Sequence, residues 1–317
     1  MATQTIGVVA RTRKRHGGAL REEALWGWLL QIPNILGLAI FFIGPLIASF
    51  VMIFTNWEII TPPTFAGLDN FKALLADPLF GVALANTAFV TLIAVPLYMV
   101  LGLALALALN QKLRGISIYR VIFFLPSQMP AVANTVLWLW LFNPDYGLVN
   151  WALSLLHLPT STWIADPTMA KPSLILLGVW GIGSGMIIYL AGLQGIPQTL
   201  YEAADIDGAA AWHRFRNITL PLLSPVIFFN LIIGIIGSMQ SGFTTTYIAT
   251  GGSSDSGGPE NSLLLLVLYI FHQGFVDFHM GYASLLAWVL CIIILALTLI
   301  NFKLAGRWVY YEGAEKG

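Results

Sequence analysis

The chain has 317 residues, of which 57% are hydrophobic and only 9% are Asp, Glu, Lys or Arg, whereas about 25% of the residues in an ordinary soluble domain are charged. The 15 basic and 15 acidic side chains cancel, so the net charge gives no indication of nucleic acid as a partner. This composition excludes a soluble globular enzyme.

Charged residues are absent from six long stretches, 24–57, 78–111, 121–144, 172–201, 217–254 and 278–302. Each is longer than the about 20 residues that an α-helix needs to cross a bilayer. The apolar residues are continuous and do not alternate, which favours helices over barrel strands. The sequence therefore predicts an all-α integral membrane protein, with a domain of residues 26–306 and six transmembrane helices at about 29–55, 82–109, 118–141, 173–194, 221–246 and 280–303.

The distribution of Lys and Arg predicts the orientation. Thirteen of the 15 basic residues lie in the N-terminal tail 1–25, in the loops after the second and fourth spans, and at the C-terminal end that includes the tail 307–317. Cytoplasmic loops carry an excess of basic residues, so both termini are expected in the cytoplasm. The two remaining basic residues, Lys72 and Lys171, then lie outside.

Two apolar segments are too short or too polar to be spans. Residues 146–165 contain Asn150, His157 and Pro159, and are expected to form a loop with a short amphipathic helix near Trp151 to Leu156. Residues 261–276 number only 16, which favours an interfacial or re-entrant segment.

The six stretches contain no acidic or basic residue by definition, which disfavours an ion-coupled carrier, because such carriers use ionisable groups within the membrane. No P-loop motif is present, so any ATP hydrolysis must belong to a partner. The single cysteine, Cys291, cannot form an intrachain disulfide or a paired-thiolate metal site. Glycines at 181, 183 and 185 are expected to bend the fourth span or to admit a close neighbour.

Residues 195–220 form the predicted cytoplasmic loop between the fourth and fifth spans. Pro197 suits the first turn of a helix, Asp207-Gly208 ends it, and a second short helix is expected over 209–215 before Pro221 begins the fifth span. Such an elbow can enter a groove on another protein, and Glu202 offers a charge for a specific contact. A connector lying on the lipid surface is the alternative interpretation.

The loop carries a family motif. Glu202-Ala203-Ala204, then Gly208, Ile218 and Leu220-Pro221 resemble the EAA motif in the membrane subunits of ABC importers. The segments that resemble the carbohydrate branch, and in particular the larger membrane subunit of the maltose transporter, include Leu68-Asp69-Asn70-Phe71, Phe124-Leu125-Pro126 and Gly281-Tyr282-Ala283-Ser284. The resemblance covers about residues 25–305 and implies the type I importer (MetI-like) permease fold.

The resemblance also implies the partners of the chain. They are a second, homologous permease, two ATPase subunits that bind ATP and Mg, and an external sugar-binding protein, in the plasma membrane of a prokaryote. No cofactor is expected on this chain, and lipid is expected around its spans. The residues implied in ATPase coupling are Glu202, Ala203, Ala204, Asp207, Gly208, Ile218, Leu220 and Pro221.

A sugar site needs neutral polar groups and flat aromatic or glycine surfaces among apolar walls. The fourth and fifth spans offer Trp180, Gly181, Gly185, Ser238, Gln240, Ser241 and Gly242, and similar stretches line the sugar cavity in the maltose-type family. The alternative is that the polar residues bond neighbouring helices and that Trp180 is a packing residue. The chain departs from the family in one respect: its external loop 251–259 is about six residues longer than the loop that the family usually has there.

Three other functions remain as alternatives. A permease of this kind can carry glycerol phosphate or another small polar solute instead of a sugar. An ion-coupled carrier is disfavoured by the spans. A membrane scaffold or lipid-processing enzyme lacks support, since no catalytic pair is evident on either face.

Overall fold

The computed structural model describes residues 17–252 and 257–310. Arg11, Arg13, Lys14, Arg15, Asp255 and most of the C-terminal tail lie outside this description. Residues up to Val51 and residues from Met52 onward form two separate units. The regular secondary structure of the described residues is helical, as the sequence predicts, apart from one two-stranded sheet.

The first unit is an apolar helix. It consists of α1 (Gly17–Leu38), a π-helical turn η1 (Ala39–Ile43) and α2 (Gly44–Met52). The stretch Arg21–Met52 is long and apolar enough to cross a membrane, and none of its most apolar part is buried within the chain. The helix ends at Met52 and not at residue 55, because Thr55 and Asn56 pair with another strand.

That pairing opens the second unit. Strand β1 (Thr55–Asn56) runs antiparallel to β2 (Thr64–Phe65), with Thr55 opposite Phe65. Helix α3 (Asp69–Ala76) follows, and then α4 (Pro78–Leu109), which includes the predicted span 82–109. The carboxylate of Asp77 caps α4 by accepting a hydrogen bond of 2.9 Å from the Leu79 amide. Proline at the first helical position costs α4 no intrahelical bond.

Two of the predicted spans are bent. The third consists of α5 (Ile116–Phe124), η2 (Leu125–Gln128) and α6 (Ala131–Leu141), with a bend of 98°, and the fourth consists of α8 (Ala170–Val179) and α9 (Gly183–Gln194), with a bend of 47°. Prolines 126 and 130 explain the first break. The second lies among the predicted glycines, where a Cβ on Gly183 would collide with the carbonyl oxygen of Phe123. Four helices of the described residues can cross a membrane alone, or six if each bent pair is one span.

The elbow between the fourth and fifth spans begins with α10 (Gln198–Ile206) and turns into α11 (Ala211–Arg214). Its second helix differs from the expectation, because it does not stop before Pro221. It continues through a π-helical turn η4 (Phe215–Thr219) into α12 (Leu220–Gln240) and α13 (Gly242–Ala249), as one apolar stretch Ala211–Ala249. A proline collides with the carbonyl four residues earlier, and the wider π turn accommodates this clash.

The remaining elements are short except for the last. Helix α7 (Leu148–Leu155) and η3 (Trp163–Ala165) occupy the predicted loop 146–165. The 3₁₀ turn η5 (Pro259–Asn261), helix α14 (Leu266–Phe271) and the π turn η6 (His272–Val276) occupy the predicted re-entrant segment. Helix α15 (Met280–Trp308) includes the predicted sixth span.

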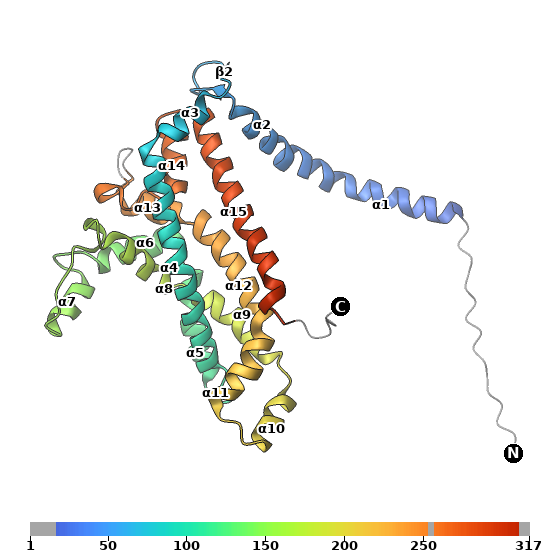
Figure 1. Ribbon diagram of the computed structural model, residues 1–317, viewed down its shortest axis with the longest axis vertical. Helices are drawn as coiled ribbons and strands as arrows, with labels where there is room; N and C mark the ends of the chain where they lie inside the picture. Colours follow the sequence, from blue (N-terminus) through green and yellow to red (C-terminus); the bar gives the residue numbers. More distant parts are fainter. Residues whose placement is uncertain (1–16, 253–256, 311–317) are drawn as a thin grey trace. The chain divides into compact units, whose positions relative to one another are not determined.

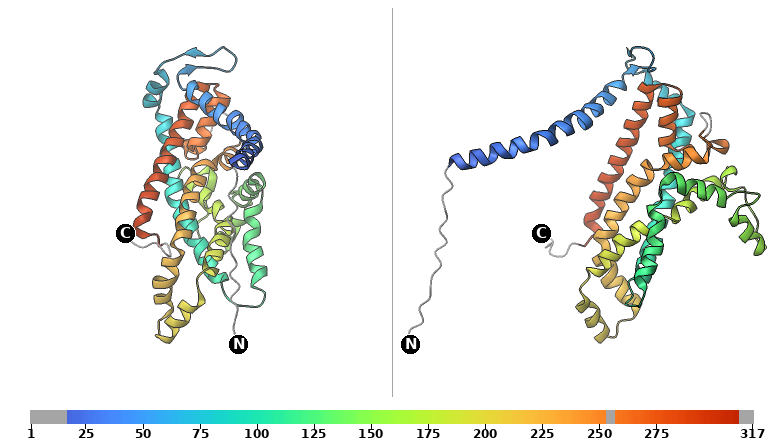
Figure 2. Two further views of the ribbon diagram at one scale, coloured as in Figure 1. Left: turned by 90° about the vertical axis from the view of Figure 1, so that its right-hand side faces the viewer. Right: turned by 180° about the vertical axis from the view of Figure 1, so that it is seen from behind.

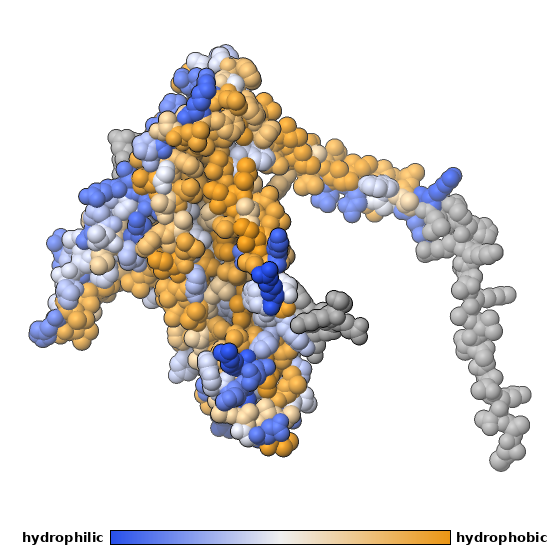
Figure 3. Space-filling model, viewed as in Figure 1, coloured by the Kyte–Doolittle hydropathy of each residue, from blue (hydrophilic) through white to orange (hydrophobic). Residues whose placement is uncertain are grey.

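Helix α4 lies at the centre of the second unit and packs against α8, α9, α12 and α14. Figure 1 shows α12 between α4 and α15, and Figure 2 shows the elbow and α3 at opposite ends of this unit. Figure 3 shows hydrophobic side chains along these helices and hydrophilic ones near both ends. At Gly192 α9 approaches α12 so closely that a Cβ would lie 2.8 Å from side-chain atoms of Leu223 and Val226.

Candidate functional site

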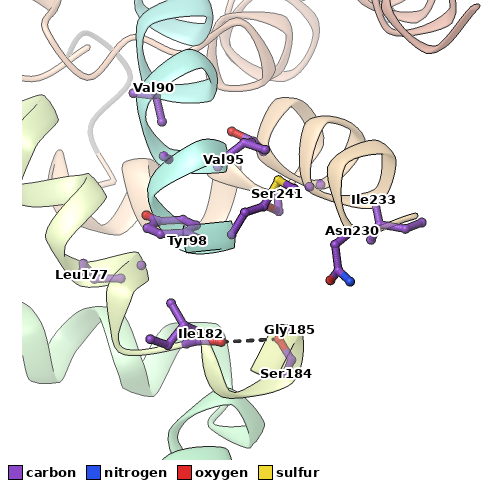
Figure 4. Close-up of a pocket in the computed structure, with 18 of the residues that line it drawn as sticks. Val90, Val95, Tyr98, Leu177, Ile182, Ser184, Gly185, Asn230, Ile233 and Ser241 are labelled. Carbon is purple, nitrogen blue, oxygen red and sulfur yellow. Dashed lines mark hydrogen bonds between the residues drawn. The ribbon is translucent and has the colours of Figure 1, made fainter. Parts of the chain in front are cut away.

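A cavity of about 380 Å³ lies between α4, the bent pair α8–α9 and the pair α12–α13. Figure 4 shows side chains from these three groups of helices facing one space. Most of the wall is apolar. The polar side chains and glycines that line it are Tyr98, Gly178, Gly181, Ser184, Gly185, Tyr189, Asn230, Gly234, Gly237, Ser238, Ser241, Gly242 and Thr245.

Hydrogen bonds fix the polar groups at the wall. The Tyr98 hydroxyl donates to the carbonyl oxygen of Ile175 at 2.7 Å, which joins α4 to α8. The hydroxyls of Thr91 and Ser238 lie 3.0 Å apart and join α4 to α12. Buried polar groups in a membrane must be satisfied by hydrogen bonds within the protein. These bonds hold the hydroxyls of Tyr98 and Ser238 at the edge of the cavity.

Asn230 contributes a side-chain carboxamide to the lining of the cavity. Its Nδ2 donates to the carbonyl oxygen of Val226 at 2.9 Å, and its Oδ1 lies across from α9, 3.8 Å from where a Cβ on Gly185 would be. Figure 4 shows this carboxamide pointing toward Ser184 and Gly185. Together with the serines, it can hydrogen-bond a ligand that carries hydroxyl groups.

The structure brings together five of the seven residues considered for a sugar site, namely Gly181, Gly185, Ser238, Ser241 and Gly242. The other two do not line the cavity. Trp180 packs edge-on against Trp138, with ring centroids 5.8 Å apart, and the side chain of Gln240 is exposed on α12.

Five polar residues of the cavity were missing from the sequence interpretation: Tyr98, Ser184, Tyr189, Asn230 and Thr245. Asn230 and Thr245 satisfy the same criterion as Ser238, since they are neutral polar residues in the fifth charge-free stretch. The helical spacing of residues 230, 234, 238, 241 and 245 also indicates one common face. Tyr98 belongs to the second span, which carried no such signal.

The elbow 197–220 has a well-defined turn. Gly208 has φ +70°, and two hydrogen bonds close around it, from the Ala209 amide to the Ala204 carbonyl at 2.9 Å and from the Gly208 amide to the Asp205 carbonyl at 3.1 Å. This pair of bonds is the Schellman arrangement that ends a helix at a left-handed residue. It makes the predicted break at Asp207-Gly208 a sharp reversal.

Side-chain contacts join the two arms of the elbow. Arg214 forms an ion pair with Asp205, and the hydroxyls of Tyr201 and Thr219 lie 2.8 Å apart. Tyr201 and Ile218 also pack against a core formed by α4, α9 and α12. The elbow is therefore attached to the helices that form the cavity.

The outer face of the elbow is exposed. Glu202 and Ala203 are exposed, Ile206 is 88% exposed and Trp212 is 65% exposed. Ala204, Ile218 and Pro221 are half-buried, whereas Asp207, Gly208 and Leu220 are exposed. Exposed apolar side chains beside exposed acidic residues, here Glu202, Asp205 and Asp207, are typical of a surface that binds another protein.

A polar cluster lies at the opposite end of α4. The carboxylate of Asp77 accepts hydrogen bonds of 2.5 Å from the hydroxyls of Tyr269 and Tyr282. Burial raises the pKa of Asp77, but these two bonds and those from the amides of Leu79 and Phe80 outweigh it and hold the pKa below its usual value. The cluster joins α4 to α14 and α15. Within the described ranges, no three His, Cys, Asp or Glu side chains lie close enough together to hold a metal ion.

Residues 99–307 match the family model of binding-protein-dependent transport system inner membrane components. The chain is 40% identical to the probable ABC transporter permease protein YesP of Bacillus subtilis over 94% of this chain and 96% of that protein. It is 35% identical to the trehalose/maltose transport system permease protein MalF of Thermococcus litoralis over 89% and 94% of the two chains.

The fold has a close match among solved structures. A bacterial ABC transporter involved in the import of the acidic polysaccharide alginate superimposes with a TM-score of 0.79, covering 91% of this chain and 99% of that chain at 24% identity. At this identity the match establishes the fold, which is that of an ABC importer permease.

Proposed function

The chain belongs to the family of binding-protein-dependent transport system inner membrane components, and from this premise we propose that it forms half of the translocation pathway for a sugar. The proposed substrate is a di- or oligosaccharide or a related polyol. Its similarity to a trehalose/maltose permease supports this class. The observation that carries the proposal is the cavity, where hydroxyl and amide groups stand among apolar walls and glycines.

The composition of the cavity favours a neutral solute. None of its lining residues is Lys, Arg or His, so a phosphate would enter the wall without a cation to neutralise it. Glycerol phosphate therefore remains the weaker alternative. The lining also contains no carboxylate, which is the group that an ion-coupled carrier would use.

In this proposal the elbow transmits the energy of ATP hydrolysis from a partner to the membrane helices. We propose that its exposed face docks on an ATPase subunit, which binds ATP and Mg, and that Glu202 contacts that partner. A second, homologous permease and an external sugar-binding protein complete the importer. In this arrangement both termini and the elbow lie in the cytoplasm, and the chain resides in the plasma membrane of a prokaryote.

Replacing Glu202 by Lys tests the coupling. Reversal of a charge at a partner surface typically costs about 2–5 kcal/mol when the pair is buried, so ATP-dependent uptake should fall at least tenfold while membrane abundance stays normal. Asp145→Lys is the matched control, since Asp145 is also an exposed acid but lies in the loop after α6. Normal uptake by Glu202→Lys at normal abundance would leave the elbow as a mere connector. Uptake by the chain without any ATPase would point instead to a carrier.

A further inference from the structure

A second hollow lies between α4 and α8, on the faces of these helices that do not line the cavity. It is a groove of about 350 Å³ with an almost entirely apolar wall. Its lining residues are Phe89, Ile93, Leu97, Trp163, Pro172, Ile175, Leu176 and Val179. Phe89, Ile93 and Leu97 are four residues apart along α4, so this wall extends about 12 Å along the helix axis.

A cation stands at one end of this groove. Lys171 precedes Pro172, and its Nζ lies 5.2 Å from the centroid of the Phe89 ring. The ammonium donates one hydrogen bond to Asn86 Oδ1 at 2.9 Å. An ammonium carries three donors, so this bond fixes its position and uses one of them. Among the lining residues, Phe89 and Pro172 mark the cationic end, whereas Leu97 and Val179 mark the deep end.

An indole stands at the same end as the lysine. Trp163 Nε1 donates to Asn150 Oδ1 at 2.8 Å, and its ring stacks on Phe142 with centroids 4.9 Å apart. Its orientation is therefore fixed while one side of it faces the groove. Trp and Lys concentrate at the level of lipid headgroups, where the apolar part of each lies in hydrocarbon and the polar part in water.

We propose that this groove binds an anionic phospholipid, with one acyl chain along α4 and α8 and the phosphate against Lys171. The apolar wall suits an acyl chain and excludes a sugar, while the single ammonium complements a phosphate. In the orientation proposed above, the lipid belongs to the outer leaflet. The site itself is independent of that orientation and of the solute.

The lipid would act on the wall of the cavity. Ile175 contributes its side chain to the groove and its carbonyl oxygen to the bond with Tyr98, a residue of the cavity. An acyl chain packed along this seam holds α4 and α8 together from the membrane side. The groove is therefore a place where lipid composition influences the translocation pathway.

Native mass spectrometry of the full chain, purified with its partner subunits and delipidated, tests the proposal by titration with phosphatidylglycerol. One basic residue near a membrane surface changes the affinity for anionic lipid about fivefold. Lys171→Gln, which keeps a donor for Asn86, should lose about that factor, whereas Lys171→Arg should bind normally. The control is Lys72→Gln, because Lys72 is exposed and paired with Asp69.

A second variant fills the groove and leaves the charge in place. Leu176→Trp should also reduce phosphatidylglycerol binding, whereas Leu92→Trp, at a 74% exposed position of α4 outside the groove, should not. Thermal unfolding of each complex verifies that it is folded.

Three results would overturn the proposal. One is equal binding of phosphatidylglycerol and phosphatidylcholine that Lys171→Gln does not change. Another is full displacement of phosphatidylglycerol by inorganic phosphate, which would reveal an anion site without a chain groove. The third is efficient cross-linking of a cysteine at position 176 to the partner permease, which would make the groove a subunit interface.

Discussion

Asn230 projects its carboxamide into the cavity from α12, and a leucine at this position would keep its volume but lose its hydrogen bonds. One hydrogen bond contributes about 0.5–1.5 kcal/mol, so Asn230→Leu should raise the sugar concentration for half-maximal uptake about two- to tenfold. Abundance in the membrane should not change. Transport assays with the sugar bound by the accompanying binding protein measure this shift.

The control for this prediction is Gln240→Leu. Gln240 follows Ser238 by two positions, which places it about 200° around the helix from that serine, and its side chain is exposed. We expect less than a twofold change. An equal effect of the two substitutions would mean that the solute approaches α12 from another face.

Asp77 makes the stability of the polar cluster at the start of α4 depend on pH. Its pKa is lower in the folded chain than the ordinary value of 3.8, so its contribution is complete above that value and disappears as the pH falls through the folded pKa. The double variant Tyr269→Phe/Tyr282→Phe removes both phenol donors. Its melting temperature should lie below that of the wild type at pH 6, and the difference should narrow at pH 3. A constant difference would show that the tyrosines act only by packing.

At the scale of the element, the elbow depends on Gly208. A residue with a Cβ loses about 1–2 kcal/mol in the left-handed region, and β-branched valine fits there worst. Gly208→Val should therefore distort the end of α10 and reduce ATP-dependent uptake more than tenfold at normal abundance. Gly208→Asn should keep more activity, because Asn adopts this conformation more readily.

Gly115→Val is the matched control for the elbow. Gly115 has φ +81°, and a Cβ there meets nothing within 4 Å, as at Gly208. The same backbone strain is then placed in the loop before α5. Equal losses in the two variants would assign the defect to general strain and not to coupling.

The elements differ in how well the sequence predicts them. The reversal at Asp207-Gly208 is predictable because glycine is the residue that ends a helix in the left-handed conformation. The continuity of the helix through Pro221 is not, since it depends on the π turn η4 and on the packing of Tyr201 and Ile218 against the core. A local rule for proline gives a helix start at this position, and tertiary contacts override it.

The lining of the cavity is likewise predictable from the sequence only in part. Ser238, Ser241 and Gly242 follow from polarity within an apolar span, and helical periodicity would have removed Gln240 and added Asn230. Tyr98 and its bond to Ile175 join helices far apart in the sequence. Hydropathy identifies a span but does not show which of its faces meets another span, so this half of the site requires the structure.

For the whole molecule, the orientation in the membrane is the main prediction. In a Cys291→Ser background, cysteines at positions 112 and 202 should react with a membrane-impermeant reagent only after the cells are opened. Cysteines at 72 and 145 should react in intact cells, because Lys72 lies in α3 and Asp145 in the loop after α6, both on the predicted external side, and both side chains are exposed. Labelling of position 202 in intact cells would reverse the proposed orientation.

The close approach of α9 to α12 at Gly192 gives the long helix a fulcrum. Trp212 on the elbow lies 11 residues before Leu223 and Ser238 lies 15 residues after it, so the two arms measure about 16 Å and 22 Å. A tilt about Leu223 moves the cavity end opposite to the elbow and about 1.4 times as far. If the elbow docks on an ATPase as proposed, the helix would act as a lever that converts a small movement of the elbow into a larger one at the cavity.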